Sequence, residues 1–125
     1  MLNYCIFEEK MKREIKFRAV DKKTGKAVYS DSFISLSNFF RKLDRTNIIT
    51  DSILQEWSGV KDMNNLDIYE GDIVMVYFHN NRFKATVMFS NGCFITSKSI
   101  GAWGNSLGGW NVPVEVIGNI YSKQI

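Results

Sequence analysis

Apolar side chains occupy every position of one stretch of the chain, and this stretch indicates a β-strand. Residues 73–78 read Ile-Val-Met-Val-Tyr-Phe, so both faces of an extended chain would be apolar there. Just before it, Glu70-Gly71-Asp72 predicts a tight turn, because glycine adopts positive φ without steric cost. A strand that is apolar on both faces is buried on both, or lies centrally in a small barrel.

A meander of three strands is predicted over residues 73–96. Its clearest signal is Asn91-Gly92 between two strand-like runs, because both central residues of a type I′ hairpin turn need positive φ. Residues 112–117 give a further strand. Pro113 lies at its edge or its start, since proline has no amide hydrogen to donate within a sheet.

In the N-terminal part, apolar residues recur with two other spacings. Residues 14–20 alternate charged or small with apolar residues, and a polar turn leads to a returning strand, so residues 14–30 predict a β-hairpin. Lys16 and Arg18 would project together from its outer, solvated face. A short helix follows, capped by Ser35 or Ser37, with apolar residues at three- and four-residue spacing. These apolar residues are Leu36, Phe39, Phe40 and Leu43.

The predicted fold class is therefore mainly β with one short helix. With 125 residues, the chain has the length of about one domain with a smaller appendage. Residues 1–10 form an N-terminal extension and residues 11–50 the hairpin and helix. Residues 51–125 form a small, five-stranded SH3-like β-barrel, which five short strands with tight turns predict.

Cysteine usage and hydropathy favour a soluble protein of the reducing cytoplasm. Cys5 and Cys93 are far apart, and no secretory signal precedes them, so we expect free thiols. No apolar run approaches the roughly 20 residues of a membrane span. A membrane partner is therefore not expected.

The charge is unevenly distributed. The net charge is +3, yet residues 11–50 carry ten Lys and Arg against four Asp and Glu, while residues 51–71 carry one against five. Neighbouring segments of opposite sign more often indicate complementarity within or between subunits than a nucleic-acid surface.

No catalytic or metal-binding motif is evident, so we expect neither an enzyme nor a cofactor. His79, the single histidine, has no nucleophile beside it in a recognisable motif. The carboxylates of Asp67, Glu70 and Asp72 match no calcium-loop spacing, and a turn at Gly71 explains them better than a metal site.

The candidate binding residues are aromatic and basic. Trp103 and Trp110 lie in a loop rich in Gly, Ser and Asn, and large rings in such loops are typical of adaptable contact surfaces. The alternative is that they fold back over the mouth of the barrel. If the loop is open, Tyr77, Arg82 and Lys84 would lie beside it, a layout used for peptides and for single-stranded nucleic acid.

Four segments in the same order resemble the YopX family of phage and prophage proteins. They are residues 11–19 (Met-Lys-Arg-Glu-Ile-Lys-Phe-Arg-Ala), 59–62, 68–74 (Ile-Tyr-Glu-Gly-Asp-Ile-Val) and 115–121 (Glu-Val-Ile-Gly-Asn-Ile-Tyr). The resemblance implies an SH3-like C-terminal barrel and a phage or prophage origin, but no established activity and hence no functional residues. Members usually have tryptophan where this chain has Val20, and they commonly begin at the equivalent of Met11, which we expect to be the natural start.

We therefore expect an accessory protein that acts in the cytoplasm of the bacterial host by binding, to another protein or to itself as a homo-oligomer. The alternative is a nucleic-acid-binding module that uses the barrel aromatics and the basic N-terminal hairpin. The basic residues of that hairpin are Lys12, Arg13, Lys16, Arg18, Lys22 and Lys23.

Overall fold

The chain folds into two antiparallel four-stranded sheets and one α-helix, so the predicted mainly β class with one short helix is confirmed. The computed structural model describes residues 14–45, 52–98, 107 and 112–122. The strands are β1 (Phe17–Asp21), β2 (Ala27–Tyr29), β3 (Ser52–Lys61), β4 (Asp67–Tyr69), β5 (Asp72–Phe78), β6 (Asn81–Ser90), β7 (Cys93–Thr96) and β8 (Val114–Asn119). The helices are the 3-10 helix η1 (Ser30–Ser32) and α2 (Leu36–Arg45).

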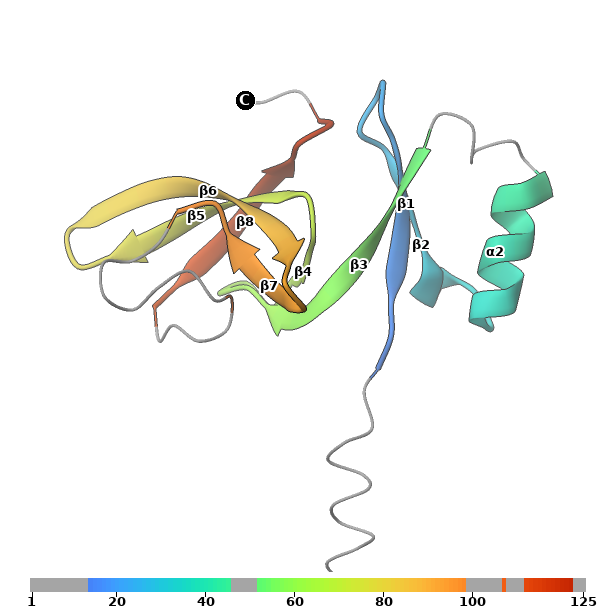
Figure 1. Ribbon diagram of the computed structural model, residues 1–125, viewed down its shortest axis with the longest axis horizontal. Helices are drawn as coiled ribbons and strands as arrows, with labels where there is room; N and C mark the ends of the chain where they lie inside the picture. Colours follow the sequence, from blue (N-terminus) through green and yellow to red (C-terminus); the bar gives the residue numbers. More distant parts are fainter. Residues whose placement is uncertain (1–13, 46–51, 99–106, 108–111, 123–125) are drawn as a thin grey trace, which may run out of the picture.

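Strands β1, β2 and β3 of the first sheet lie between the helix and the second sheet, whereas β4, at the end of the first sheet, lies beside the second one (Figure 1). The strand order of the first sheet is β2-β1-β3-β4, and that of the second sheet is β7-β6-β5-β8. Side chains alternate along β1, so Phe17 and Ala19 belong to the cluster that α2 covers, while Arg18 and Val20 are buried on the opposite face. Both faces of β1 are therefore covered by protein.

Helix α2 docks on this chain's own core. Of the two predicted caps, Ser35 is the one observed, because its Oγ accepts a hydrogen bond from the Asn38 amide at 3.2 Å. Phe39 and Leu43 are buried against Ala19 and its neighbours. Phe40, the second residue of the aromatic pair, stays 39% exposed.

The second sheet contains the predicted meander, with Asn91 and Gly92 at positive φ in the β6–β7 turn. Strand β5 is central, between β6 and β8, but only one of its faces is fully buried. Val74 and Val76 pack there with Ile68 of β4, which covers the inner face of the sheet. The described strands form a half-barrel, and closure into a five-stranded SH3-like barrel stays a prediction.

Strand β3 links the two halves of the molecule. Residues 52–56 pair with β1, and the strand then continues to Lys61 and pairs with β4. Gly59, at a φ of 85°, lies where the β3–β4 register shifts, and the strand passes through this irregularity. A segment that begins in the N-terminal sheet thus ends over the half-barrel.

Candidate functional site

The structure places three of the predicted binding residues together. Tyr77 lies opposite Arg82, and Lys84 lies opposite Met75, on the outer face of strands β5 and β6. Arg82 and Lys84 are exposed, whereas the Tyr77 hydroxyl donates a hydrogen bond to the Glu115 carboxylate at 2.8 Å. That hydrogen bond raises the pKa of Tyr77. Trp103 and Trp110 lie outside the described residues.

The prediction that Arg18 lies on a solvated face of the hairpin is wrong, because the residue is only 4% exposed. Lys16 is also largely covered: its Nζ lies 4.3 Å from the Trp57 ring and 3.1 Å from Asp67 Oδ2. The physical reason is that the second sheet and strand β4 cover this side of β1. Neither residue presents a free basic group to a phosphate.

Arg18 instead forms a buried ion pair that joins the two sheets. Its Nη2 donates to Asp72 Oδ1 at 2.7 Å, and its Nε donates to Gln55 Oε1 at 2.9 Å. Asp72 Oδ2 accepts a hydrogen bond from the Tyr69 amide at 2.8 Å. Burial raises the pKa of Asp72, and the charge of Arg18 opposes this shift. The charges of this junction are therefore satisfied within the chain.

The carboxylates near Gly71 are bound by the chain's own groups. Besides Asp72, Glu70 accepts a hydrogen bond from the Glu56 amide at 2.9 Å, and Asp67 binds Lys16 and Lys61, both at 3.1 Å. Within the described ranges, His, Cys, Asp and Glu side chains form no group of three that could hold a metal ion.

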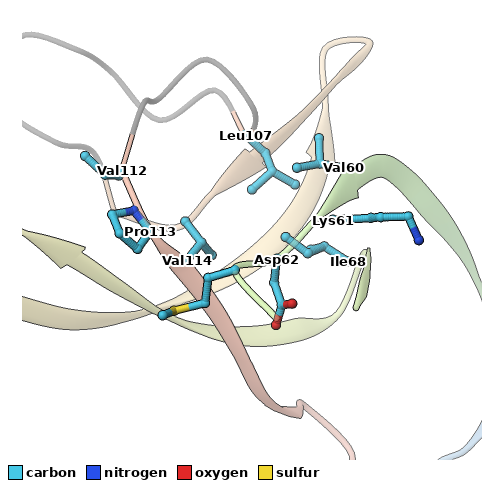
Figure 2. Close-up of a pocket in the computed structure, with 9 residues that line it drawn as sticks. Val60, Lys61, Asp62, Ile68, Leu107, Val112, Pro113 and Val114 are labelled. Atoms are coloured by element: carbon cyan, nitrogen blue, oxygen red, sulfur yellow. The ribbon is translucent and has the colours of Figure 1, made fainter. Parts of the chain in front are cut away.

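A pocket opens at one end of the half-barrel, with a volume of about 260 Å³ (Figure 2). It is called the apolar pocket here because most of its lining side chains are apolar, although Lys61 and Asp62 line it too. It lies between the ends of β3 and β8, and its lining is largely aliphatic. The lining residues are Val60, Lys61, Asp62, Met63, Ile68, Leu107, Val112, Pro113 and Val114.

Asp62 fixes one rim of this pocket. Its Oδ1 accepts hydrogen bonds from the amides of Asn64 and Leu66, at 2.8 and 2.9 Å, and its Oδ2 accepts one from the Val116 amide at 2.9 Å. The turn between β3 and β4 is thereby held against β8, although it presents apolar side chains to water. Met63 and Leu66 remain 56% and 55% exposed. Exposed apolar side chains beside an apolar pocket are typical of contact surfaces.

Comparison with known proteins settles the family. The model of the YopX protein family matches residues 16–124, which is nearly the whole chain. The chain belongs to the YopX family. The resemblance found in the sequence is therefore confirmed. Val20, which follows the Arg18-Ala19 pair, is completely buried.

The fold of this YopX chain is similar to that of a solved bacterial protein. The crystal structure of protein EF1440 from Enterococcus faecalis matches with a TM-score of 0.52 and 16% sequence identity, covering 88% of this chain and 95% of that one. At this identity the similarity shows a shared fold only. None of the curated proteins matches the chain. Within the described residues, no helix is long and apolar enough to cross a membrane.

Sequence reasoning missed the pocket rim in this YopX chain. Met63 and Leu66 interrupt a turn otherwise made of Asp and Asn, and these apolar residues in a polar turn were the available signal. Leu107, which reaches the pocket from the loop before β8, gave no comparable signal.

Asp67 makes stability depend on pH. Although burial disfavours its charge, hydrogen bonds from Lys61 and Lys16 hold the pKa of Asp67 below its usual 3.8. A carboxyl with a lowered folded-state pKa stabilises the fold above its unfolded pKa, and this contribution is lost as pH falls through the folded pKa. We expect Asp67→Asn to lower the free energy of unfolding by about 1 kcal/mol at pH 7 and by much less near pH 3. Urea unfolding at both pH values measures this.

The control is Asp44→Asn, at an exposed carboxylate on α2. We expect this variant to unfold like the wild type at both pH values. If Asp67→Asn lowered the free energy of unfolding by the same amount at pH 7 and at pH 3, the electrostatic explanation would be contradicted.

Proposed function

We propose that this YopX protein is a phage or prophage accessory protein that binds another protein in the cytoplasm of the bacterial host. The observation that carries the proposal is the apolar pocket, which Met63 lines, together with the exposure of Met63 and of Leu66 on the same turn; Leu66 itself lines a second pocket at the junction of the sheets. The chemistry proposed for the partner is an apolar segment that fills the pocket and covers this turn. A second copy of the chain is the alternative partner within the same proposal.

The energetics of the rim support this mode of binding. Covering a Leu or Met side chain that is about half exposed stabilises a complex by roughly 1 kcal/mol. The rim is also fixed in advance by the three hydrogen bonds to Asp62, so little ordering of the turn opposes binding. No catalytic step is part of the proposal.

Nucleic-acid binding is the second candidate, favoured by the exposed pair Arg82 and Lys84 on the outer sheet face. Its proposed surface is smaller than the sequence suggested, because Lys16 and Arg18 are engaged within the protein. Such binding would weaken steeply with salt as ions compete for the phosphates, whereas binding through an apolar pocket would not. Salt dependence therefore separates the two candidates.

The test is partner capture by cross-linking in the host, with Met63→Glu compared with the wild type. A carboxylate on the rim would have to be desolvated by an apolar partner, so we expect at least about a tenfold loss of captured partner. Quantitative mass spectrometry measures it, and the capture is repeated in host-cell lysate at low and high salt, with and without nuclease added before the cross-linker.

Met88→Glu is the matched control, because Met88 is 40% exposed on the outer sheet face and does not line the pocket. We expect it to capture the partner as the wild type does. If the two variants lose capture equally, or if nuclease abolishes capture, the proposal fails.

A further inference from the structure

A second pocket lies at the junction of the two sheets, and its lining, unlike that of the apolar pocket, contains several charged side chains. Its volume is about 370 Å³, within the range of small-ligand sites. Strands β1, β4 and β5 contribute Arg18, Tyr69 and Asp72 to its lining, and Tyr29, Asp31 and Ser32 come from the end of β2 and from η1.

Tyr69 is the unexplained residue of this pocket. It is 2% exposed, yet its hydroxyl makes no hydrogen bond within the part of the chain that the structure describes. Its ring is fixed by the Arg18 guanidinium, 4.7 Å from the ring centroid, and by an edge contact with Tyr29 at 5.6 Å. A buried, rigidly held hydroxyl without a partner is costly, and a ligand that hydrogen-bonds to it would remove this cost.

The charges around Tyr69 decide which ligand fits. The lining carries three carboxylates, Asp31, Asp67 and Asp72, against the single cation Arg18. Arg18 is neutralised by Asp72, and Asp67 is shared by Lys16 and Lys61. Asp31 forms no ion pair with any residue in the described ranges and is exposed. With Lys16 and Lys61 included, the cations and carboxylates of the junction are equal in number, and among the described residues Asp31 is the carboxylate left without an ion-pair partner. The ligand that complements it is a cation that donates hydrogen bonds.

The protonation of Tyr69 is consistent with this. Burial, and then the negative charges of Asp31 and Asp67, raise the pKa of Tyr69 well above its usual range, so the hydroxyl stays neutral and can accept a hydrogen bond.

We propose that the junction pocket binds an alkylammonium or guanidinium group, with Asp31 as its counter-ion and the Tyr69 hydroxyl as a hydrogen-bond acceptor. The group comes either from a free polyamine or from a Lys or Arg side chain of a protein. The inference does not depend on the apolar pocket, and Asp31→Asn should leave capture through Met63 unchanged.

The test is calorimetric titration of the full chain with N-acetyl-arginine methylamide, N-acetyl-lysine methylamide and spermidine, with the uncharged N-acetyl-norleucine methylamide as a control ligand. We expect at least one cation to bind and the uncharged ligand not to bind. Losing a charged hydrogen bond weakens binding about tenfold or more, so we expect that loss for Asp31→Asn and a several-fold loss for Tyr69→Phe. Tighter binding of spermidine would assign a free polyamine, and tighter binding of an amino-acid amide would assign a protein side chain.

Asp44→Asn is again the matched control and should bind within about twofold of the wild type. Thermal melting of each variant tests whether it is folded. If Tyr69→Phe does not fold, Asp31→Asn alone tests the inference, because Asp31 is exposed and its replacement should not disturb the fold. Binding that is equal in Asp31→Asn and Asp44→Asn, or no cation binding at up to about 10 mM ligand, would overturn the inference.

Discussion

Replacing Arg18 by alanine is expected to lower the free energy of unfolding by about 3–5 kcal/mol, because the variant leaves the carboxylate of Asp72 buried without its partner. The variant also loses the hydrogen bond to Gln55 and the stacking on Tyr69. Chemical unfolding monitored by tryptophan fluorescence measures the change. A loss of this size is a large fraction of the stability of a small domain.

Arg82→Ala provides the control, because Arg82 is an exposed arginine on the outer face of β6. Surface substitutions of this kind usually change stability by less than about 0.5 kcal/mol. If Arg18→Ala and Arg82→Ala unfold alike, the buried ion pair does not hold the junction, and the layering of the two sheets around it would be wrong.

The second large effect is expected for Gly71→Ala. Gly71 has a φ of 84°, and an added Cβ would overlap the side-chain amide of Gln55, the residue that also holds Arg18. Its own amide donates to the Val87 carbonyl at 2.8 Å, and its carbonyl accepts from the Ile120 amide at 2.9 Å, so the backbone cannot easily move away. Positive φ and overpacking together are expected to cost about 3 kcal/mol, measured by the same unfolding experiment.

Gly59→Ala separates these two contributions. Gly59 has nearly the same φ, 85°, but an added Cβ there would meet no atom within 4 Å. Only the backbone strain remains, about 1–2 kcal/mol. If Gly71→Ala and Gly59→Ala lowered the free energy of unfolding equally, the contact with Gln55 would not be tight, and the described packing of the junction would be contradicted.

Local signals in the sequence were sufficient for part of the secondary structure. The Ser35 cap, the Asn91-Gly92 turn and the apolar run at 73–78 each depend on neighbours in sequence, and all three are confirmed. Pro113 likewise precedes β8 directly, as its missing amide hydrogen requires.

The burial of Arg18 could not be predicted in the same way. A period of two shows which side chains share a face of a strand, but it does not show what covers that face. Arginine is usually exposed, and its partner Asp72 lies 54 residues away in sequence. The same limit applies to both pockets, whose walls combine segments from distant parts of the chain.

Two features of the candidate sites had a weak local signal. Met63 and Leu66 were visible as apolar residues in a polar turn, whereas Tyr69 read as an ordinary strand residue. Only the packing of Tyr69 against Arg18 of β1 and Tyr29 of β2 reveals that the Tyr69 hydroxyl is buried without a partner among the described residues.

The most direct measurement for the proposed function is amide hydrogen exchange of the protein alone and with its captured partner. Asp62 and Met63 donate their amides to Leu66 and Val114 at the pocket rim, so partner binding there should slow exchange at residues 62–66 and 112–116. Exchange along β6, residues 81–90, should not change. Slower exchange confined to β6 and the outer sheet face, with the pocket rim unaffected, would contradict binding through the apolar pocket.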